Sequence, residues 1–335
     1  MFDFINIYIS IICIVIFIGI IKIYIKIKYG FWSIQPVFHY YNLLYWVYPI
    51  GIINKNLPKT NKYCDFINSK TDSFVDIDNK EIESIIEFIQ KHYYRTKYGS
   101  YLPTKNVFIH NFDSTNKKGF ITTYFENKKE FDKDSNLFIS KKHIAGVMTT
   151  KNLNITLNTK SFNIYYVDYL TVDSNYRKKG IAPIIIQTHE YWQAHKNNKY
   201  QISLFKREGE LTGIVPLCVY KTYLFNNIQT EDRLHASMSI IEITNLNIGL
   251  LTNFIHSKKK SFDCFILPDL SNLISLINNN IYKIYGIICN NELISCYCYR
   301  DSQMLYDNKD KSLEFFASIS NCLSEVFFSG FLISL

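Results

Sequence analysis

The sequence predicts a mixed α+β fold that is preceded by one transmembrane helix. Three patterns indicate this: an apolar run over residues 4–21, isoleucines at helical spacing over 82–93 with strand-length apolar runs after them, and a hairpin signal over 281–299. The chain has 335 residues, of which 47% are hydrophobic and 20% charged. This is the composition of a folded protein and the length of roughly two domains.

The first element is a hydrophobic segment close to the length that a membrane-spanning helix needs, residues 4–21 (FINIYISIICIVIFIGII). Asp3 precedes the segment, lysines follow it, and no small-residue cleavage pattern appears, so a retained anchor is favoured over a cleaved signal peptide. We expect a single-pass anchor over residues 1–27, with the folded domain in the cytosol because the basic flank is C-terminal. The flanking lysines are Lys22, Lys26 and Lys28.

Net charge, sequence motifs and cysteine spacing indicate which kinds of partner and metal site to expect. The formal net charge of +8 fits an anionic ligand or an anionic membrane surface, and it equally fits a scattered coat of solvated charges. No helix-turn-helix, zinc-finger or aromatic-basic RNA motif is present, so nucleic acid is not an expected partner. The eight cysteines form no CxxC pair and match no zinc spacing, which predicts free thiols in a reducing compartment and no metal site.

Hydrophobic periodicity predicts the order of the central elements. Residues 51–79 are polar and are expected to form an irregular surface connection. Four isoleucines and a tyrosine at i, i+3, i+4, i+7 and i+11 mark one face of an amphipathic helix: Ile82, Ile85, Ile86, Ile89 and Tyr93. The elements expected after it are strands at 144–150, 153–158 and 163–172, a helix at 181–196, a strand at 200–205 and a helix near 216–226.

The last third of the chain predicts a smaller α+β half. IYKIYGIICN, NNEL and LISCYCYR read as strand, turn and strand of a hairpin. We therefore expect one domain over residues 28–228 and a smaller, shortened half over 229–335.

A glycine-containing loop between a strand and a helix carries the strongest chemical signal. Residues 167–183 read VDYLTVDSNYRKKGIAP, with a strand ending near Val172 and a helix beginning after Gly180. Such a turn presents unpaired backbone N–H groups at the positive end of a helix dipole, where a pyrophosphate binds well. Gly180 allows close approach of the ligand, and Arg177, Lys178 and Lys179 add positive charge. The alternative is an ordinary basic loop before a helix.

This loop and the order of elements around it resemble the GNAT acyltransferases, and the Ala182-Pro183 ending resembles N-myristoyltransferase more closely. Upstream, residues 31–37 (FWSIQPV) resemble that family's FWxTQPV element, with Ile in place of Thr. Downstream, residues 218–226 lie at the spacing of its Cys-Arg-Tyr-Trp-His-Arg-Ser-Leu-Asn segment, and 292–299 resemble its later hairpin. The resemblance implies a GNAT-type acyl-CoA N-acyltransferase fold with a second, incomplete GNAT-like half.

The resemblance also implies a reaction and a set of site residues. The reaction is transfer of a fatty acyl group, myristoyl in the family, from acyl-CoA to an N-terminal glycine amine, with no resident cofactor. Backbone N–H groups of Tyr169 and Leu170 would form the oxyanion hole, and Tyr94 and Tyr220 would contact the acceptor. The residues implied for acyl-CoA binding are Gly30, Phe31, Trp32, Tyr169, Leu170, Thr171, Val172, Lys178, Gly180, Ile181 and Ala182.

The chain departs from the family pattern mainly on the peptide side. Asp168 replaces an Asn, Thr222 replaces a His, and the basic stretch 95–99 replaces an acidic one. The KFGxGDG signature is absent, and the chain stops earlier than the family, whose own C-terminal carboxylate is the base. Asp168, Glu208 and the carboxylate of Leu335 are the candidate bases. A GNAT N-acetyltransferase and a catalytically inactive acyl-CoA-binding protein remain as alternatives.

A histidine pair on the helix after the glycine loop invites a metal-site reading, which helix geometry excludes. His189 and His195 are six residues apart, so at about 100° per residue they diverge by more than half a turn and cannot bind one metal together. We expect a structural or solvated role for both.

Overall fold

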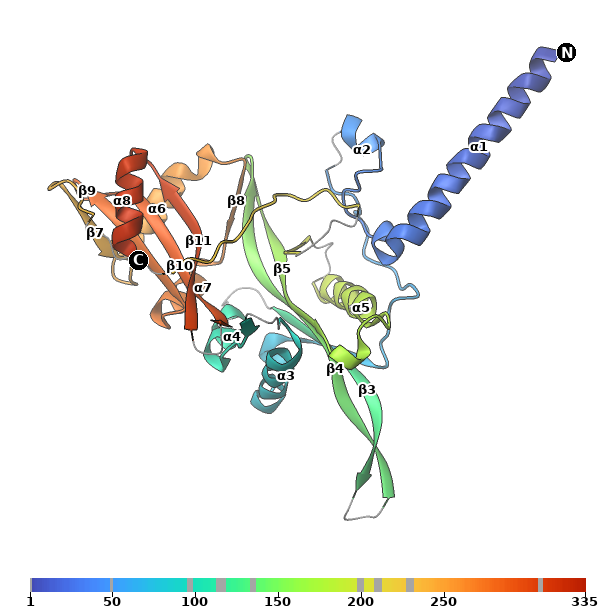
Figure 1. Ribbon diagram of the computed structural model, residues 1–335, viewed down its shortest axis with the longest axis horizontal. Coiled ribbons are helices and arrows are strands. Elements are labelled where there is room, and N and C mark those ends of the chain that lie inside the picture. Colours follow the sequence, from blue (N-terminus) through green and yellow to red (C-terminus); the bar gives the residue numbers. More distant parts are fainter. Residues whose placement is uncertain are drawn as a thin grey trace. The chain divides into compact units, whose positions relative to one another are not determined.

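The computed structural model describes residues 2–48, 51–94, 99–112, 119–132, 137–197, 202–207, 213–226, 232–306 and 310–335 (Figure 1). Its contacts divide the chain into two compact units that do not follow the order of the sequence. Unit 1 comprises residues 1–57 and 207–224, and unit 2 comprises residues 58–206 and 225–335.

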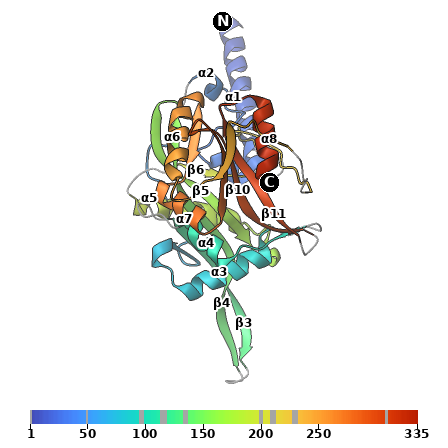
Figure 2. The same cartoon turned by 90° about the vertical axis from the view of Figure 1, so that its left-hand side faces the viewer.

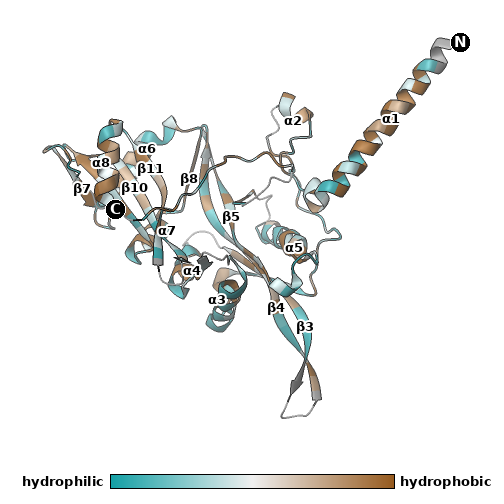
Figure 3. Ribbon diagram, in the orientation of Figure 1, coloured by the Kyte–Doolittle hydropathy of each residue, from teal (hydrophilic) through white to brown (hydrophobic). Residues whose placement is uncertain are grey.

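Unit 1 begins with the long apolar helix α1, Phe2–Tyr29, whose 28 residues give a length of about 42 Å. In the described part of the chain it is the only helix long and apolar enough to cross a membrane, and none of its apolar window is buried. Figure 3 shows it as a largely hydrophobic rod with polar residues near its C-terminal end. A short 3-10 helix, η1 (Gly30–Ile34), and one turn of helix, α2 (Leu44–Val47), follow.

The second segment of unit 1 pairs with the residues after η1. The backbone N–H of Tyr40 donates to the carbonyl of Gly213 at 3.0 Å, and that of Val215 donates to Phe38 at 2.7 Å. The helix expected near 216–226 is wrong, because this segment has no regular secondary structure. Its apolar side chains stay exposed, Val219 by 77%, so no packed stripe supports a helix in a stretch poor in helix-forming residues.

Unit 2 contains a first sheet in the order β1-β3-β4-β5-β6, with β8 also paired to β4. All pairs are antiparallel except β5 with β6. The strands are β1 Ser69–Ser73, β3 Phe120–Asp132, β4 Leu137–Leu157, β5 Lys160–Val172, β6 Ser203–Phe205 and β8 Cys264–Leu267.

One prediction about strands and one about a connection need correction. The runs 144–150 and 153–158 belong to one strand, β4, because the polar residues between them keep their register: Lys151 pairs with Tyr166 and Asn152 with Tyr165. The connection 51–79 is not wholly irregular, because it contains β1 and the 3-10 helix η2 (Phe74–Asp76).

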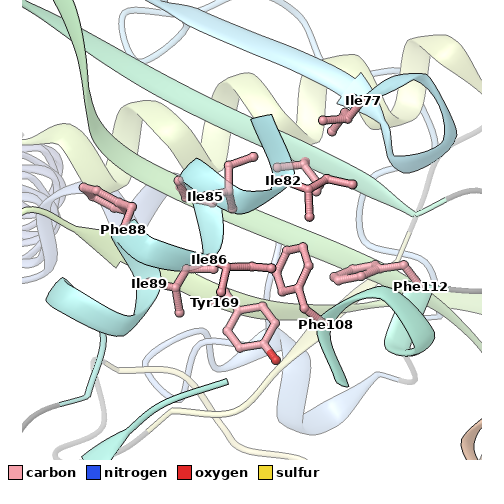
Figure 4. Close-up of a cluster of buried hydrophobic side chains, with 11 residues drawn as sticks. Ile77, Ile82, Ile85, Ile86, Phe88, Ile89, Phe108, Phe112 and Tyr169 are labelled. Carbon is pink, nitrogen blue, oxygen red and sulfur yellow. The ribbon is translucent and has the colours of Figure 1, made fainter. Parts of the chain in front are cut away.

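Helices cover both faces of the first sheet. On one face lie α3 (Asn79–His92) and α4 (Lys105–Phe112), and on the other lies α5 (Ile181–Lys196). The isoleucine face predicted for α3 is confirmed, since Ile85 and Ile89 are fully buried against Phe108 and Tyr169 (Figure 4). Asp78 caps α3 by accepting the backbone N–H of Glu81 at 2.7 Å. The helix predicted at 181–196 is confirmed as α5.

The second sheet of unit 2 has the order β11-β10-β9-β7, with β2 also paired to β10. The predicted hairpin is confirmed: β9 and β10 are joined by Asn290 and Asn291, both with positive φ, as a two-residue hairpin turn requires. Figure 2 shows α6 and α7 on one side of this sheet and α8 on the other. The elements are β2 Gly99–Tyr101, β7 Met238–Glu242, β9 Tyr282–Cys289, β10 Glu292–Tyr306, β11 Asp310–Ser320, α6 Ile248–Lys258, η4 Lys259–Ser261, α7 Leu270–Asn278 and α8 Ser324–Ser334.

The two sheets exchange edge strands. β8, from the last third of the chain, pairs with β4, and β2, from the first third, pairs with β10. Within unit 2, each sheet therefore contains strands from both of the predicted ranges, 28–228 and 229–335.

Candidate acyl-CoA site

A β-bulge near the end of β5 is the most unusual feature of the first sheet. Val147 pairs with Thr171 and Thr149 with Asp168, so Tyr169 and Leu170 together face only one residue of β4. Tyr169 has φ of +35°, a conformation that non-glycine residues rarely adopt. On its other edge β5 pairs with β6 over residues 165–167, and residues 168–172 have no strand partner on that side among the residues that the structure describes.

Packing on both faces of the sheet holds the bulge in place. The Tyr169 ring is buried among α3 and α4 (Figure 4), 5.4 Å from the ring of Phe108, and its hydroxyl lies 3.0 Å from that of Tyr101. Burial raises the pKa of the Tyr169 phenol well above its usual value, so this group stays neutral. Leu170 packs on the opposite face, against α5.

The carboxylate of Asp168 touches the bulge directly. Its Oδ1 accepts the backbone N–H of Tyr169 at 3.2 Å, and its Oδ2 lies 3.7 Å from the ammonium of Lys151. One of the two predicted oxyanion donors is therefore already bound to the neighbouring carboxylate. Sequence reasoning placed Asp168 beside the donors but gave no sign of this contact.

Thr171 and Val172 connect the bulge to the loop that follows. The Thr171 hydroxyl is buried and donates to the Tyr169 carbonyl at 3.2 Å, which fixes the peptide between the two bulged residues. The Val172 carbonyl accepts from the guanidinium of Arg177 at 3.3 Å, and the same guanidinium donates to the His92 carbonyl at 2.6 Å. Arg177 therefore ties the loop to the end of α3 instead of presenting its charge to a ligand.

The loop ends in two residues with positive φ, Lys178 at 64° and Gly180 at 80°. Gly180 is the N-cap of α5 and has no side-chain cap. A Cβ at Gly180 would meet nothing within 4 Å, so glycine is required there by the backbone angle and the space in front is open. Backbone N–H groups in such a turn form an anion-binding concavity.

The first turn of α5 completes that concavity. The N–H groups of Ile181 and Ala182 have no intrahelical acceptor by helix geometry, and no acidic residue lies in this turn. Pro183 follows them and has no N–H to satisfy. The arrangement suits a phosphate, whose charge the helix dipole favours.

Two lysines flank a tyrosine beside the loop. The Lys179 ammonium lies 4.6 Å from the ring centroid of Tyr176, and the Lys128 ammonium lies 5.4 Å from it. Lys128 belongs to β3 and was not among the predicted site residues. No local pattern identifies it, because its position depends on the twist of the β3–β4 hairpin.

The remaining predicted residues are divided between the two units. Gly30, Phe31 and Trp32 belong to unit 1, where Phe31 is buried and its ring lies 5.3 Å from that of Trp32. Tyr220, 61% exposed, also belongs to unit 1, whereas Tyr94, 40% exposed, belongs to unit 2. Their shared role in one site stays a prediction.

Of the other two candidate bases, Leu335 is the one that the described residues include. Leu335 follows α8, whose Ser334 hydroxyl lies 2.7 Å from that of Tyr299. Within the described ranges, no hydrogen bond or ion pair connects Leu335 with residues 168–170. Glu208 and the basic residues 95–98 lie outside the described residues.

His189 has the structural role that its spacing predicted. Its Nδ1 lies 2.9 Å from the hydroxyl of Thr122, and its Nε2 lies 2.9 Å from that of Thr150. Burial lowers the pKa of His189 to about 4, so the ring is neutral at physiological pH. Among the residues that the structure describes, no three His, Cys, Asp or Glu side chains gather as a metal site would require.

The mixed sheet with its bulged strand and the glycine turn into α5 resemble the fold of an acyl-CoA N-acyltransferase. Solved structures identify the fold more closely. The chain superposes on Saccharomyces cerevisiae N-myristoyltransferase with bound myristoyl-CoA at a TM-score of 0.57 and 12% identity, over 87% of this chain and 75% of the yeast chain.

Two further structures of the yeast protein agree with this match. One with bound myristoyl-CoA has a TM-score of 0.59 at 11% identity, covering 88% of this chain and 72% of that one. One with bound myristoyl-CoA and inhibitors has a TM-score of 0.52 at 11% identity, covering 81% and 67%. By sequence, no family model and no curated protein matches the chain. The predicted N-myristoyltransferase fold is therefore confirmed by structure.

Proposed function

We propose that this protein transfers a fatty acyl group from acyl-CoA to an amine, with the N-terminal glycine of a protein or peptide as the acceptor. The observation that carries the proposal is the continuity of residues 169–182. This one segment holds the bulge, an open strand edge and the anion-binding turn. A CoA thioester presents a carbonyl, two amides and a pyrophosphate in that same order.

Each part of the segment has a role in holding the donor. The pyrophosphate binds the N–H groups of Gly180, Ile181 and Ala182, with Lys178 nearby. The pantetheine amides pair with the unpartnered edge of β5, as an added strand would. The thioester carbonyl reaches the bulge at Tyr169 and Leu170. The resemblance adds Phe31 and Trp32 of unit 1 as further acyl-CoA contacts.

The reaction needs a charge stabiliser and a proton acceptor. Attack of the amine nitrogen on the thioester carbon forms a tetrahedral oxyanion, which backbone N–H groups at the bulge stabilise. Collapse of this intermediate breaks the carbon–sulfur bond and releases CoA as the thiolate. Before attack, the acceptor ammonium gives one proton to a carboxylate, which leaves the neutral amine as the nucleophile. The nitrogen loses its second proton after attack, and the departing thiolate can take it.

Asp168 is the base that we propose to test first. In the structure its Oδ1 occupies the Tyr169 N–H, which is where the thioester carbonyl would bind. Arrival of the carbonyl would displace the carboxylate from that donor and leave it available to the incoming ammonium. Substrate binding and exposure of the base would then be one event. The Leu335 carboxylate and Glu208 are the further candidates.

The same contact favours a second function. If Asp168 keeps the Tyr169 N–H when acyl-CoA is bound, the oxyanion loses a donor and the protein binds acyl-CoA without catalysis. The test is turnover of glycine-terminated peptides by the full chain over acetyl-, lauroyl-, myristoyl- and palmitoyl-CoA, read by mass spectrometry. Acylation with a long chain supports the main proposal, acetylation alone supports an N-acetyltransferase, and tight binding without product supports the acyl-CoA-binding protein.

We also propose that α1 anchors the protein in a membrane with the remaining chain in the cytosol. The length of α1, its exposed apolar surface and the basic residues of its last turn, Lys26 and Lys28, support this.

A further inference from the structure

We propose that exposed apolar residues around α2 form a membrane-contact surface that lies in the lipid headgroup layer beside α1. The inference goes beyond acyl transfer and rests on the proposed membrane span of α1. We define the α2 patch as Leu43, Leu44, Trp46, Val47 and Tyr48.

The α2 patch is unusually apolar for a surface in water. Five of the six residues from 43 to 48 have large hydrophobic side chains that are between 60% and 77% exposed. Soluble proteins seldom leave a contiguous patch of this kind uncovered, and such patches mark protein or membrane contacts.

The patch rests on a fixed platform and is not a frayed end. The ring of Phe38 packs against those of Tyr45 and Trp46, with centroids 5.6 and 5.0 Å away. The Trp46 indole N–H donates to the Tyr40 carbonyl at 2.9 Å. Phe38 in turn pairs with Val215 of the second segment of unit 1. These contacts hold the apolar side chains outward.

The platform is packed onto the end of α1. Tyr29, the last residue of α1, stacks on Tyr41 at 5.4 Å and meets Tyr40 edge-on at 6.3 Å. Gly213 lies against both Tyr29 and Tyr41, where a Cβ would be only 3.1 Å from either ring. Within unit 1, therefore, the helix and the α2 patch are parts of one packed body. Within unit 1, Figures 1 and 2 both show α2 displaced from the C-terminal end of α1 in the direction in which α1 extends.

The position of Tyr29 along α1 sets the depth of the patch. Tyr29 lies eight residues after Ile21, the end of the apolar run, which is about 12 Å along the helix. The headgroup layer on each side of the hydrocarbon core is roughly 5–8 Å thick. Along an upright helix the platform thus lies about 4–7 Å beyond that layer, and residues projecting from it toward the membrane reach the layer.

The chemistry of the patch fits this depth. Tryptophan and tyrosine favour the headgroup level, where an apolar ring and a polar group are both accommodated. Lys22, Lys26 and Lys28, on the last turns of α1, supply positive charge for anionic headgroups at the same level. We therefore assign the patch to a bilayer that contains anionic lipid.

The test is tryptophan quenching in the full chain, reconstituted into phosphatidylcholine–phosphatidylserine vesicles. The phosphatidylcholine is brominated either just below the headgroup or deep in the acyl chain. One variant keeps only Trp46 (Trp32→Phe, Trp192→Phe) and a matched variant keeps only Trp192 of α5 (Trp32→Phe, Trp46→Phe). A third has Phe17→Trp in α1 and Phe in place of all three native tryptophans.

We expect Trp46 to lose most of its emission to the shallow bromines and less to the deep ones. The tryptophan at position 17 should respond more to the deep bromines, and Trp192 to neither. Quenching at position 17 without quenching of Trp46 would overturn the membrane-contact surface and leave the anchor standing. If neither position is quenched, α1 does not insert and both proposals fail.

Discussion

Asp168 makes two polar contacts. Its Oδ1 accepts the Tyr169 N–H at the bulge, and its Oδ2 lies 3.7 Å from the Lys151 ammonium. These contacts fit two roles for the carboxylate. In the first it binds the Tyr169 N–H until the substrate carbonyl replaces it and then acts as the base. In the second it only stabilises the strand. The distinction depends on charge, so a substitution that removes charge and keeps shape separates the roles.

We expect Asp168→Asn to lower kcat at least about 100-fold, the lower range of a lost general base, with acyl-CoA affinity unchanged. The amide oxygen can still accept the Tyr169 N–H, so the bulge should persist. Lys151→Met, which removes the ion pair and keeps the carboxylate, is the control and should retain turnover. Steady-state kinetics and calorimetry check both. Full activity in Asp168→Asn would exclude the base role and direct attention to Leu335.

Gly180 combines a backbone angle that favours glycine with open space in front of it. Asn and Asp tolerate positive φ better than other residues and differ here only in charge. We expect Gly180→Asp to weaken CoA binding by about 1.5–3 kcal/mol, which is roughly 10- to 150-fold, and Gly180→Asn to weaken it less. Calorimetry of the two variants decides the point. Equal losses would mean that shape, and not phosphate charge, controls the turn.

His189 makes stability depend on pH. As pH falls, the unfolded imidazole takes a proton near pH 6.5, whereas the buried ring resists protonation until about pH 4. Stability is therefore full above pH 6.5 and declines between 6.5 and 4, by about 3 kcal/mol for an isolated group. Denaturant unfolding at several pH values measures the decline. The slope should be smaller in His189→Gln, and an identical slope would assign the decline to other groups.

At the scale of elements, the end of β5, the start of α5 and the loop between them form the candidate acyl-CoA site. β5 has a bulge near its end, and α5 begins after Gly180, which has no side-chain cap. The guanidinium of Arg177 donates to the carbonyl of His92, and this contact fixes the loop between the two elements. The β3–β4 hairpin adds Lys128, which lies beside Tyr176 together with Lys179.

We expect Lys128→Gln to weaken acyl-CoA binding a few-fold at low salt, because an exposed charge near a phosphate contributes up to about 1 kcal/mol. The loss should disappear at high salt, where such interactions are screened. Lys142→Gln, an exposed lysine on the same hairpin, changes the net charge equally and should have little effect. Similar losses from both variants would indicate a general charge effect and not a local site.

At the scale of the molecule, α1 and the exchange of edge strands determine how the chain is organised. The exchange of β2 and β8 makes the two sheets interdependent, so neither sequence half is expected to fold alone. The orientation of α1 decides which compartment supplies acyl-CoA.

The proposed cytosolic orientation can be tested by glycosylation in microsomes. Lys259→Asn creates a sequon over residues 259–261 in the surface turn η4, and an N-terminal extension can carry a second sequon. We expect a glycan on the extension and none at position 259. Modification at position 259 would reverse the topology. The natural sequon at Asn154 is a poor reporter, because it lies within β4 and its side chain donates to Asp269.

Features that depend on neighbouring residues could be predicted from local patterns in the chain. α1, α3, α5 and the β9–β10 hairpin follow from local apolar spacing and from the Asn290–Asn291 turn, and the glycine turn before α5 follows from one residue type. The expected helix near 216–226 failed, because its apolar residues find no face to bury.

No local pattern predicted the bulge at Tyr169 and Leu170, the contact of Asp168 with the Tyr169 N–H, or the position of Lys128 beside Tyr176, because these depend on long-range contacts. Each requires a partner that is distant in sequence: β4 supplies the mismatch in register, and α3 and α4 hold the Tyr169 ring. Strain at a positive φ persists only where such packing outweighs its cost, and the packing energy comes from residues that no local pattern brings together.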